Sequence, residues 1–510
     1  MKIQKSIMRK LSPALAIKAA NADKEHHLKR NTLNQYSLAL MAVGISVGAG
    51  IFTVGATAIS TVAGPSTIIS FLIAAVVCGF ATLCYAEFAS VIPLTGSSYT
   101  YAYISMGECI AWIVGWNLLL EYLLAASLIS KVWGNYLCGI IQTITGNEHF
   151  TTSVDFGLIT FDFAPAILLT VLSIFVLFGA KMTTTVNNIF VTVKVGIIIF
   201  IIFAGSMFIK FSNFVPFIPA SRLSNPTGSD VAAKGIDLTQ SLLQLILGQS
   251  HTVFGFMGIL SAASLVVFAF LGFESVAGTA EETINPKVNV PKGLFLGLAI
   301  ITVLYIGVTS VIAGMVSVDE WASYISNNDM KPSLATAFKI RGVLWAGTVI
   351  EIGAIIGLTS VVLVAIYALS RTFFAISRDG LLPKWFAVTG QKDTPYRIII
   401  MCSIFMLLIS STIEISSLEE MVNIGTLVAF IIVSFGVPII RKNIPHDLAN
   451  HDQRFIVPFS PVLPIISGII CIGLAINLSI MTWIRFAVWL IIGLAIYFLY
   501  GYKHSNLSKL

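Results

Sequence analysis

The chain has 510 residues, of which 56% are hydrophobic and 11% are charged. Soluble domains average roughly 45–50% apolar and about 25% charged residues, so this composition excludes an ordinary soluble domain. The mean hydropathy of +0.91 predicts a body embedded in a lipid bilayer. The net charge of +6 does not indicate a nucleic-acid partner, because basic residues in a multi-span protein usually mark topology.

A window of about 20 residues finds the segments long enough to cross a bilayer. The twelve predicted spans are approximately 36–60, 66–90, 108–133, 164–181, 186–209, 258–281, 293–316, 343–371, 396–413, 420–440, 460–480 and 484–502. An even number places both ends on one side. Residues 1–34 hold eight Lys or Arg and no apolar core, which predicts a cytoplasmic tail instead of a signal peptide. The predicted cytoplasmic segments carry 21 basic residues and the external ones eight, which supports the same orientation.

Two of these spans contain helix-disfavouring residues near their middles. The first reads GISVGAGIF at Gly44–Phe52, and the sixth reads FAFLGFES at Phe268–Ser275. Unwound backbone inside a membrane is tolerated only where it lines a polar cavity or is buried in protein, so paired breaks of this kind are typical of a transporter site. We therefore predict an all-α membrane protein in which residues 35–440 form a core of five plus five spans. Because five is odd, the second set is inverted, and residues 441–503 add two spans before a cytoplasmic tail at 504–510.

The first break suggests how a substrate is held. A half-helix that starts near Ile51 directs unpaired N–H groups and a positive dipole end at a carboxylate. Backbone carbonyls at Val43–Ser46 and Phe268–Leu271 are then expected to be open for an ammonium group. The alternative is that Gly44 and Gly48 only let two helices pack closely.

Several ionisable residues lie inside predicted spans, where a charge is expensive without a partner or a function. Glu274 lies in the second break and either lines the site or supports the half-helix through neighbouring amides. Lys194 is deep in the fifth span, where desolvation favours loss of its proton, so it either exchanges protons or forms a permanent ion pair or a snorkelling contact. Glu121 is a second carboxylate near the site, and Glu351 has no role that the sequence indicates.

The six cysteines are scattered without C-x-x-C spacing, so the sequence predicts neither a disulfide framework nor a zinc site. We expect no metal and no cofactor.

The motifs in chain order resemble one family. They are GISVGAGIF, CYAEFASVIPLTGSSYTYAY (Cys84–Tyr103), GWNLLLEY (Gly115–Tyr122), VNNIFVTVK (Val186–Lys194), FAFLGFESVAGTAEETINP (Phe268–Pro286) and SRDGLLP (Ser377–Pro383). Together they resemble the amino acid, polyamine and organocation transporter superfamily, and within it the cationic amino acid transporters and their bacterial relatives. The resemblance covers approximately residues 34–502.

This resemblance implies a LeuT-like inverted-repeat fold and assigns roles to residues. A lysine matching Lys194 takes the place of sodium in proton-coupled relatives, and Glu121 is a candidate for the same proton coupling. The family usually has a shorter Asp at the position of Glu274, and Leu358 falls where the side chain at the pocket floor is expected. The implied substrate-binding residues are Val43, Ser46, Gly48, Ala49, Gly50, Ile51, Phe268, Ala269, Phe270, Leu271, Phe273, Glu274 and Leu358. Those of the implied inner gate are Tyr85, Glu87, Arg371, Arg378 and Asp379.

The sequence thus predicts a proton-coupled amino acid permease of the cell membrane, with a neutral substrate slightly favoured over a cationic one because Leu358 is apolar. An exchanger and a non-transporting membrane sensor are the alternatives. An enzyme is disfavoured because the predicted site carries no recognisable catalytic motif. A channel is disfavoured because midplane breaks build an occluded site. Protein partners cannot be inferred.

Overall fold

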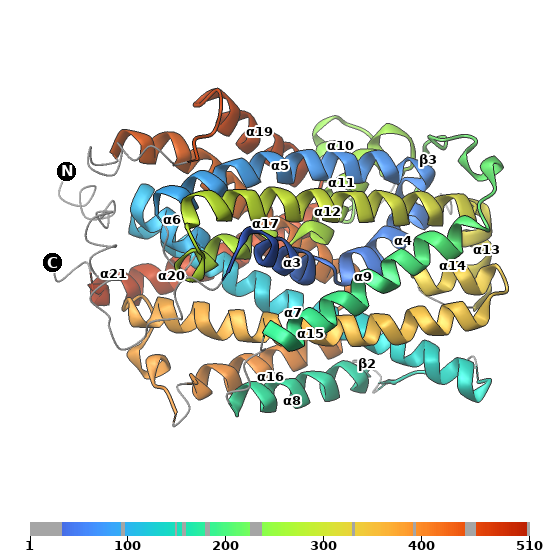
Figure 1. The fold of residues 1–510 in the computed structure, drawn as a ribbon, viewed down its shortest axis with the longest axis horizontal. Coiled ribbons are helices and arrows are strands. Elements are labelled where there is room, and N and C mark those ends of the chain that lie inside the picture. The colour runs from blue at the N-terminus through green and yellow to red at the C-terminus, as the bar shows by residue number, and fades with distance from the viewer. Residues whose placement is uncertain are drawn as a thin grey trace.

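The protein is nearly all helical, with its long helices running along the longest axis of the molecule (Figure 1). The computed structural model describes residues 33–92, 97–147, 150–155, 160–178, 184–224, 237–328, 332–390, 394–443 and 455–506. The predicted N-terminal tail before residue 33, the last four residues and part of the Ser221–Asp230 loop lie outside these ranges.

The helices follow the predicted order of spans. The first five spans are α3 (Gln35–Ser46) continued by η2 (Gly50–Val54), α4 (Gly55–Thr57) and η3 (Ala58–Val62); α5 (Thr67–Val91), preceded by η4 (Gly64–Ser66); α7 (Glu108–Thr145); α8 (Phe163–Leu177); and α9 (Thr184–Ser206). The next five are α11 (Gly255–Phe270) with η6 (Phe273–Glu282), α12 (Pro286–Met315), α15 (Leu344–Arg378), α16 (Tyr396–Thr412) and α17 (Ile415–Asn443). The last two are α19 (Val462–Ile476) and α20 (Ile480–Ile496).

Short elements form the connections at the two ends of the molecule. One end carries α6 (Ser97–Ser105), η7 (Lys384–Ala387), η8 (Tyr497–Gly501) and α21 (Tyr502–His504). The other carries η5 (Phe211–Phe214), α10 (Leu242–Ile246), α13 (Val318–Asn328) and α14 (Leu334–Ile340). It also carries two antiparallel two-stranded sheets, β1 (Ser153–Asp155) with β2 (Thr160–Asp162) and β3 (Arg222–Leu223) with β4 (Thr252–Val253). We call these the α21 end and the α14 end. In Figure 1 they lie at the left and the right.

The predicted number of spans is confirmed. Within the described residues, eight helices are long and apolar enough to cross a membrane, and a bent pair, Gln35–Ser46 with Gly50–Val62, makes a ninth span. Three shorter apolar helices, Phe163–Leu177, Tyr396–Thr412 and Val462–Ile476, coincide with the three remaining predicted spans. The fold is therefore the expected multi-span helical architecture, with its first and sixth spans broken.

Helix ends follow local chemistry. The side chain of Asn34 accepts hydrogen bonds from the amides of Tyr36 and Ser37 and so caps α3. Pro286 occupies the first position of α12, where a missing N–H costs nothing. These caps place α3 and α12 at the start of their spans, and the two helices then pack along each other.

Helix packing divides the core into two groups. The first consists of α3, α5, α11 and α12, with α12 lying on α3 and α5, and α11 lying on α5. In the second, α7 packs on α8, α15, α16 and α17. Helix α9 contacts α3, α12 and α15 and so touches both groups. Both broken spans belong to the first group and face the second.

Candidate functional site

The first break separates α3 from η2. Helix α3 ends at Ser46, Val47 leaves helical geometry with φ −72° and ψ 88°, and the chain resumes as a helix at Ala49 and Gly50 after a 50° bend. No side chain caps the start of η2. Its first N–H groups have no partner within the helix, which is the property that makes a helix N-terminus suitable for an anion. The half-helix begins one or two residues earlier than predicted.

The second break separates α11 from η6. Leu271 is extended, with φ −56° and ψ 140°, and Gly272 has φ 102°, a conformation that side chains with a Cβ rarely adopt. The carboxylate of Glu274 accepts hydrogen bonds from the Gly272 amide, at 3.2 Å to Oε1 and 3.0 Å to Oε2. Of the two readings of Glu274, the geometry favours support of the half-helix.

The two breaks contact each other through small residues. A Cβ placed on Gly50 would lie 2.2 Å from the Cα of Ala269, and one placed on Gly272 would lie 2.3 Å from Cγ2 of Ile45. Gly48 differs, because the nearest neighbour of its added Cβ would be Val361, at 3.5 Å, which is an ordinary van der Waals contact. Close packing thus explains Gly50 and Gly272, whereas Gly48 has room beside it.

The backbone carbonyls that the sequence analysis expected to be open are mostly occupied. Carbonyls of Val43 and Phe268 accept the amides of Val47 and Leu271, and that of Phe270 accepts the Ser46 hydroxyl at 3.3 Å. The Tyr305 hydroxyl lies 2.8 Å from both the Ser46 and Ala269 carbonyl oxygens. The expectation that these carbonyls have no donor was wrong for these five. Buried carbonyls at the ends of half-helices accept hydrogen bonds from neighbouring amides or hydroxyls. An ammonium could reach them only through their second lone pair.

Lys194 lies at the first break. Its side chain is buried, and Nζ donates a hydrogen bond of 2.8 Å to the carbonyl oxygen of Gly44. The side chain also packs against α15, where a Cβ on Gly357 would lie 2.9 Å from Cγ of Lys194. Among the described residues, no carboxylate lies within 4.0 Å of Nζ, so the permanent ion pair considered above is not found there.

Glu121 lies near the second break. Its side chain is buried on α7 beside α17, where a Cβ added at Gly425 would lie 4.0 Å from Cβ of Glu121. Within the described part of the chain, Oε1 of Glu121 has no hydrogen-bond partner, and neither has the amide group of Asn117 one turn earlier. This polar face of α7 is a setting in which a carboxyl could hold a proton.

Apolar predicted site residues are buried around the breaks. Val43, Ala49, Ile51, Phe268 and Leu358 are all buried. The ring of Phe270 lies 5.3 Å from that of Tyr305, and the ring of Phe273 lies 5.8 Å from that of Phe430. These two aromatic residues therefore serve packing. Leu358 lies one turn before Val361, the residue that faces Gly48.

The predicted inner-gate residues lie at the α21 end, with partners that differ from those expected. Glu87 forms a two-pronged ion pair with Arg441 of α17, at 2.6 Å for each contact, and also accepts the Val457 amide. The Tyr85 hydroxyl lies 2.6 Å from the Ser98 hydroxyl. Glu87 thus pairs with Arg441 instead of with an arginine of α15.

The predicted gate residues on and just after α15 make contacts of their own. Asp379 accepts a hydrogen bond of 2.9 Å from the hydroxyl of Tyr99. Burial raises the pKa of Asp379 above its ordinary value, although the neighbouring Arg378 and the Tyr99 hydroxyl act in the opposite direction. The Arg371 guanidinium lies over the ring of Tyr367, 5.1 Å from its centroid.

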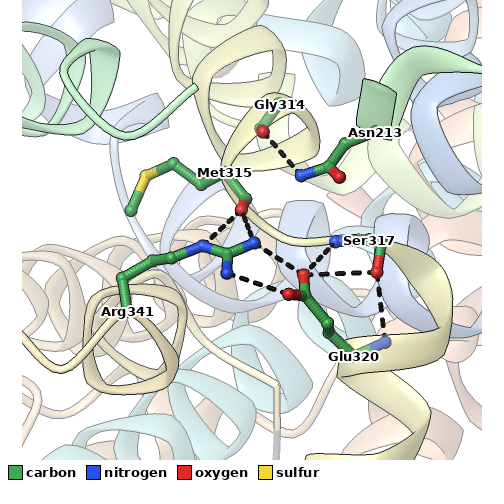
Figure 2. A network of polar contacts seen from close by, with 6 residues as sticks. All are labelled: Asn213, Gly314, Met315, Ser317, Glu320 and Arg341. Carbon is green, nitrogen blue, oxygen red and sulfur yellow. Dashed lines mark hydrogen bonds and ion pairs between the residues drawn. The ribbon is translucent and has the colours of Figure 1, made fainter. Parts of the chain in front are cut away.

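At the α14 end, ionic contacts tie the connections to the spans. Figure 2 shows Arg341 donating hydrogen bonds to the carbonyl oxygen of Met315, the end of α12, and to both carboxylate oxygens of Glu320 on α13. Ser317 donates to the same carboxylate, and the Asn213 side chain donates to the Gly314 carbonyl. Glu351, left without a role above, pairs with Lys339 of α14 at 2.6 Å, and both side chains are buried.

Sequence reasoning missed three residues that hold these elements together: Tyr305, Arg441 and Lys339. One of them had a signal. Gly293, Gly297, Ile301 and Tyr305 follow each other at four-residue spacing, which places them on one face of α12. Arg441 and Lys339 gave no such signal, because basic residues at span ends are expected from topology alone.

The fold and the site define a class, a multi-span membrane protein with two broken helices facing a helical scaffold. Comparison with known proteins supplies the family. The sequence profile described as "Amino acid permease" matches residues 33–500, and the chain belongs to that family.

Two bacterial relatives match nearly the whole chain. The chain is 36% identical to the methylthioribose transporter of Bacillus subtilis over 94% of its own length and 95% of the relative's. It is 35% identical to the branched-chain amino acid permease BcaP of the same organism over 99% of both chains. A mouse protein, cationic amino acid transporter 4, is 32% identical over 81% of this chain and 60% of its own.

Proposed function

We propose that the protein imports a neutral amino acid together with protons by alternating access. It does so in the plasma membrane of a cell, with both termini and the α21 end in the cytoplasm. The observation that carries the coupling is Lys194, whose buried Nζ contacts the Gly44 carbonyl at the first break without a nearby carboxylate. A buried ammonium without a counter-charge is favoured to lose its proton, and its hydrogen bond to Gly44 then weakens.

Substrate preference rests on the second break and on the relatives. Both oxygens of Glu274 are directed at the Gly272 amide, so this carboxylate supports the break instead of a cationic substrate side chain. Leu358 is buried and apolar. One relative is named as a branched-chain amino acid permease, which agrees with a neutral aliphatic substrate. The names of two other relatives, a methylthioribose transporter and a cationic amino acid transporter, supply the competing substrates.

Counterflow into proteoliposomes tests the substrate. Vesicles loaded with one unlabelled compound at a time take up the same compound in labelled form, with leucine, arginine and methylthioribose as the central comparison. We expect leucine or a similar neutral amino acid to give the largest signal. A largest signal from arginine or methylthioribose would reverse the assignment, and no signal from a broad panel would favour a sensor.

Driven uptake tests the coupling. Empty vesicles receive labelled substrate with either an imposed proton gradient or an imposed sodium gradient. We expect accumulation with the proton gradient alone, and loss of that accumulation in Lys194→Ala while Lys194→Met keeps substrate binding. Lys131→Ala is the matched control, because Lys131 also donates to a carbonyl, that of Ile413, but lies away from both breaks.

Three results would count against this coupling. Uptake driven by the sodium gradient would show that sodium, and not the proton, is the coupling ion. Unchanged proton-driven accumulation in Lys194→Ala would show that Lys194 has no part in coupling. Uptake that requires substrate inside the vesicle would establish an exchanger.

A further inference from the structure

Helix α12 is fastened to the first half of the broken first span. A Cβ added at Gly293 would lie 2.5 Å from Cβ of Leu38, and one added at Gly297 would lie 2.7 Å from Cβ of Ala42. Small residues four apart let two helices approach closely in a membrane. Continuing the same face of α12 by two turns leads to Tyr305, which is therefore carried to the end of α3.

The Tyr305 hydroxyl bridges the two breaks. It lies 2.8 Å from the carbonyl oxygen of Ser46, the last residue of α3, and 2.8 Å from that of Ala269 in the last turn of α11. Carbonyls in the last turn of a helix have no partner within the helix, so both need a donor from elsewhere. A phenol has a single proton, which these two acceptors share as a three-centre hydrogen bond.

The ring of Tyr305 is fixed independently of its hydroxyl. It is fully buried and meets the ring of Phe71 at 5.8 Å and that of Phe270 at 5.3 Å, in edge-on geometry at both contacts. Loss of the hydroxyl alone therefore leaves the packing of the ring in place.

We propose that Tyr305 is a positioning residue that keeps the ends of α3 and α11 at a fixed separation, so that the two breaks act as one unit during transport. It does not touch the substrate. Without it, two buried carbonyls lose their donor, and the protein populates arrangements in which the half-helices no longer face each other. Part of the binding free energy of the substrate is then used to restore the competent arrangement, which raises the apparent dissociation constant of the substrate.

Tyr305→Phe tests this. We expect KM for the transported substrate to rise about tenfold, the factor that follows from leaving a buried acceptor unpaired, while uptake at saturating substrate stays within about threefold of the parent. Tyr101→Phe is the matched control. Tyr101 is equally buried, but within the described part of the chain its hydroxyl donates to a single carbonyl, that of Ala277, at 3.3 Å, and we expect KM of this variant to stay within about twofold of the parent.

A second variant separates positioning from general damage. 4-Aminophenylalanine introduced at position 305 restores an N–H donor at the same place and should return KM to within about twofold of the parent. A purely structural defect would lower the amount of folded protein in Tyr305→Phe without changing KM, and the amine would not correct it. Unchanged KM in Tyr305→Phe would overturn the proposal.

The transport readout rests on the proposed function, so a readout without substrate accompanies it. Amide hydrogen exchange in the peptide covering residues 268–273 should be about tenfold faster in Tyr305→Phe than in the parent and unchanged in Tyr101→Phe. If the parent transports nothing in the panel, the proposed function fails while the exchange result still decides the role of Tyr305. Equal exchange in parent and Tyr305→Phe would refute the positioning role.

Discussion

The two breaks are built in different ways. The first has no residue with positive φ and is held by side chains from other spans, Lys194 on α9 and Tyr305 on α12. The second also has local support of its own, with Gly272 at φ 102° and Glu274 accepting from the Gly272 amide, besides the Tyr305 hydroxyl that reaches Ala269. A break that depends on distant donors can change when one of them loses a proton or moves. The difference is the reason that the proposed coupling is placed at the first break.

Adding a methyl group to either break should give the largest effect. Ala at position 272 combines a positive φ with a Cβ 2.3 Å from Ile45, and Ala at position 50 meets the backbone of Ala269 at 2.2 Å. Strain and overpacking together cost several kcal/mol, and we expect Gly272→Ala and Gly50→Ala to lose more than about 100-fold in initial uptake. Uptake per molecule inserted in the vesicle measures this.

Gly48→Ala is the control for both variants. Gly48 and Gly50 are both predicted at the substrate-binding site, but the nearest neighbour of an added Cβ at Gly48 is Val361, at 3.5 Å. We expect uptake within about twofold of the parent for this single methyl group. Equal losses of uptake at positions 48 and 50 would show that close helix packing does not explain this break. A substrate carboxylate site formed by both glycines would then be an explanation.

Changing Leu358, beside the first break, should have the second-largest effect, and this effect should be on substrate choice. Leu358 is buried one turn from the residue that faces Gly48. Leu358→Ser should shift the ratio of KM values for leucine and arginine by about tenfold toward arginine, because one deleted apolar group changes discrimination by roughly 10–200-fold. Competition between the two labelled amino acids measures the ratio. Leu369→Ser, a similarly buried leucine three turns further along α15, should leave it unchanged. An identical ratio in parent and Leu358→Ser would remove Leu358 from the pocket.

Removing the cap of the second break should reduce stability more than it changes transport preference. Glu274→Ala deletes the acceptor of the Gly272 amide, and lost caps of this kind cost about 0.5–2 kcal/mol. We expect a melting temperature several degrees lower for Glu274→Ala and a smaller decrease for Glu274→Gln, which keeps one oxygen at the same place. Thermal unfolding in detergent at constant pH measures both. Equal melting temperatures of Glu274→Ala and the parent would contradict the supporting role of Glu274 and favour its other role, which is to line the substrate site.

The contrast between the breaks also explains what could be predicted from sequence. Apolar length located all twelve spans, and glycines located both breaks, because each signal is local in the chain. Glu274 and Gly272 are two residues apart, and the sequence analysis could therefore list support of the half-helix as one role for Glu274. Lys194 stood out because a charge in the middle of a span is rare.

The partners of the first break could not be predicted, because they are set by packing between distant segments. Tyr305 lies 259 residues from Ser46 and 36 from Ala269 in the chain, and an aromatic residue in a span usually signals packing only. The ion pair of Glu87 with Arg441 joins residues 354 positions apart, and no local signal in the sequence connects them. The carbonyls of Ser46, Ala269 and Phe270, which were expected to be open, are occupied for the same reason.

The network of Figure 2 touches neither break, so changing it should have the smallest effect. Partial burial alone would raise the pKa of Glu320, but hydrogen bonds from Arg341 and Ser317 outweigh it and hold the pKa below its ordinary value. A carboxylate with a depressed pKa contributes stability above the unfolded pKa of about 4.3 and loses it as pH falls through the folded pKa. Because the side chain of Glu320 is 39% exposed, we expect this contribution to the free energy of unfolding to be less than about 1 kcal/mol.

The melting temperature of Glu320→Gln should lie slightly below that of the parent at about pH 7 and approach it by about pH 3, with uptake unchanged. Asp319→Asn, whose exposed partner Arg222 is 3.7 Å away, should match the parent throughout. A stability difference for Glu320→Gln that grows as pH falls would contradict the sign of this linkage.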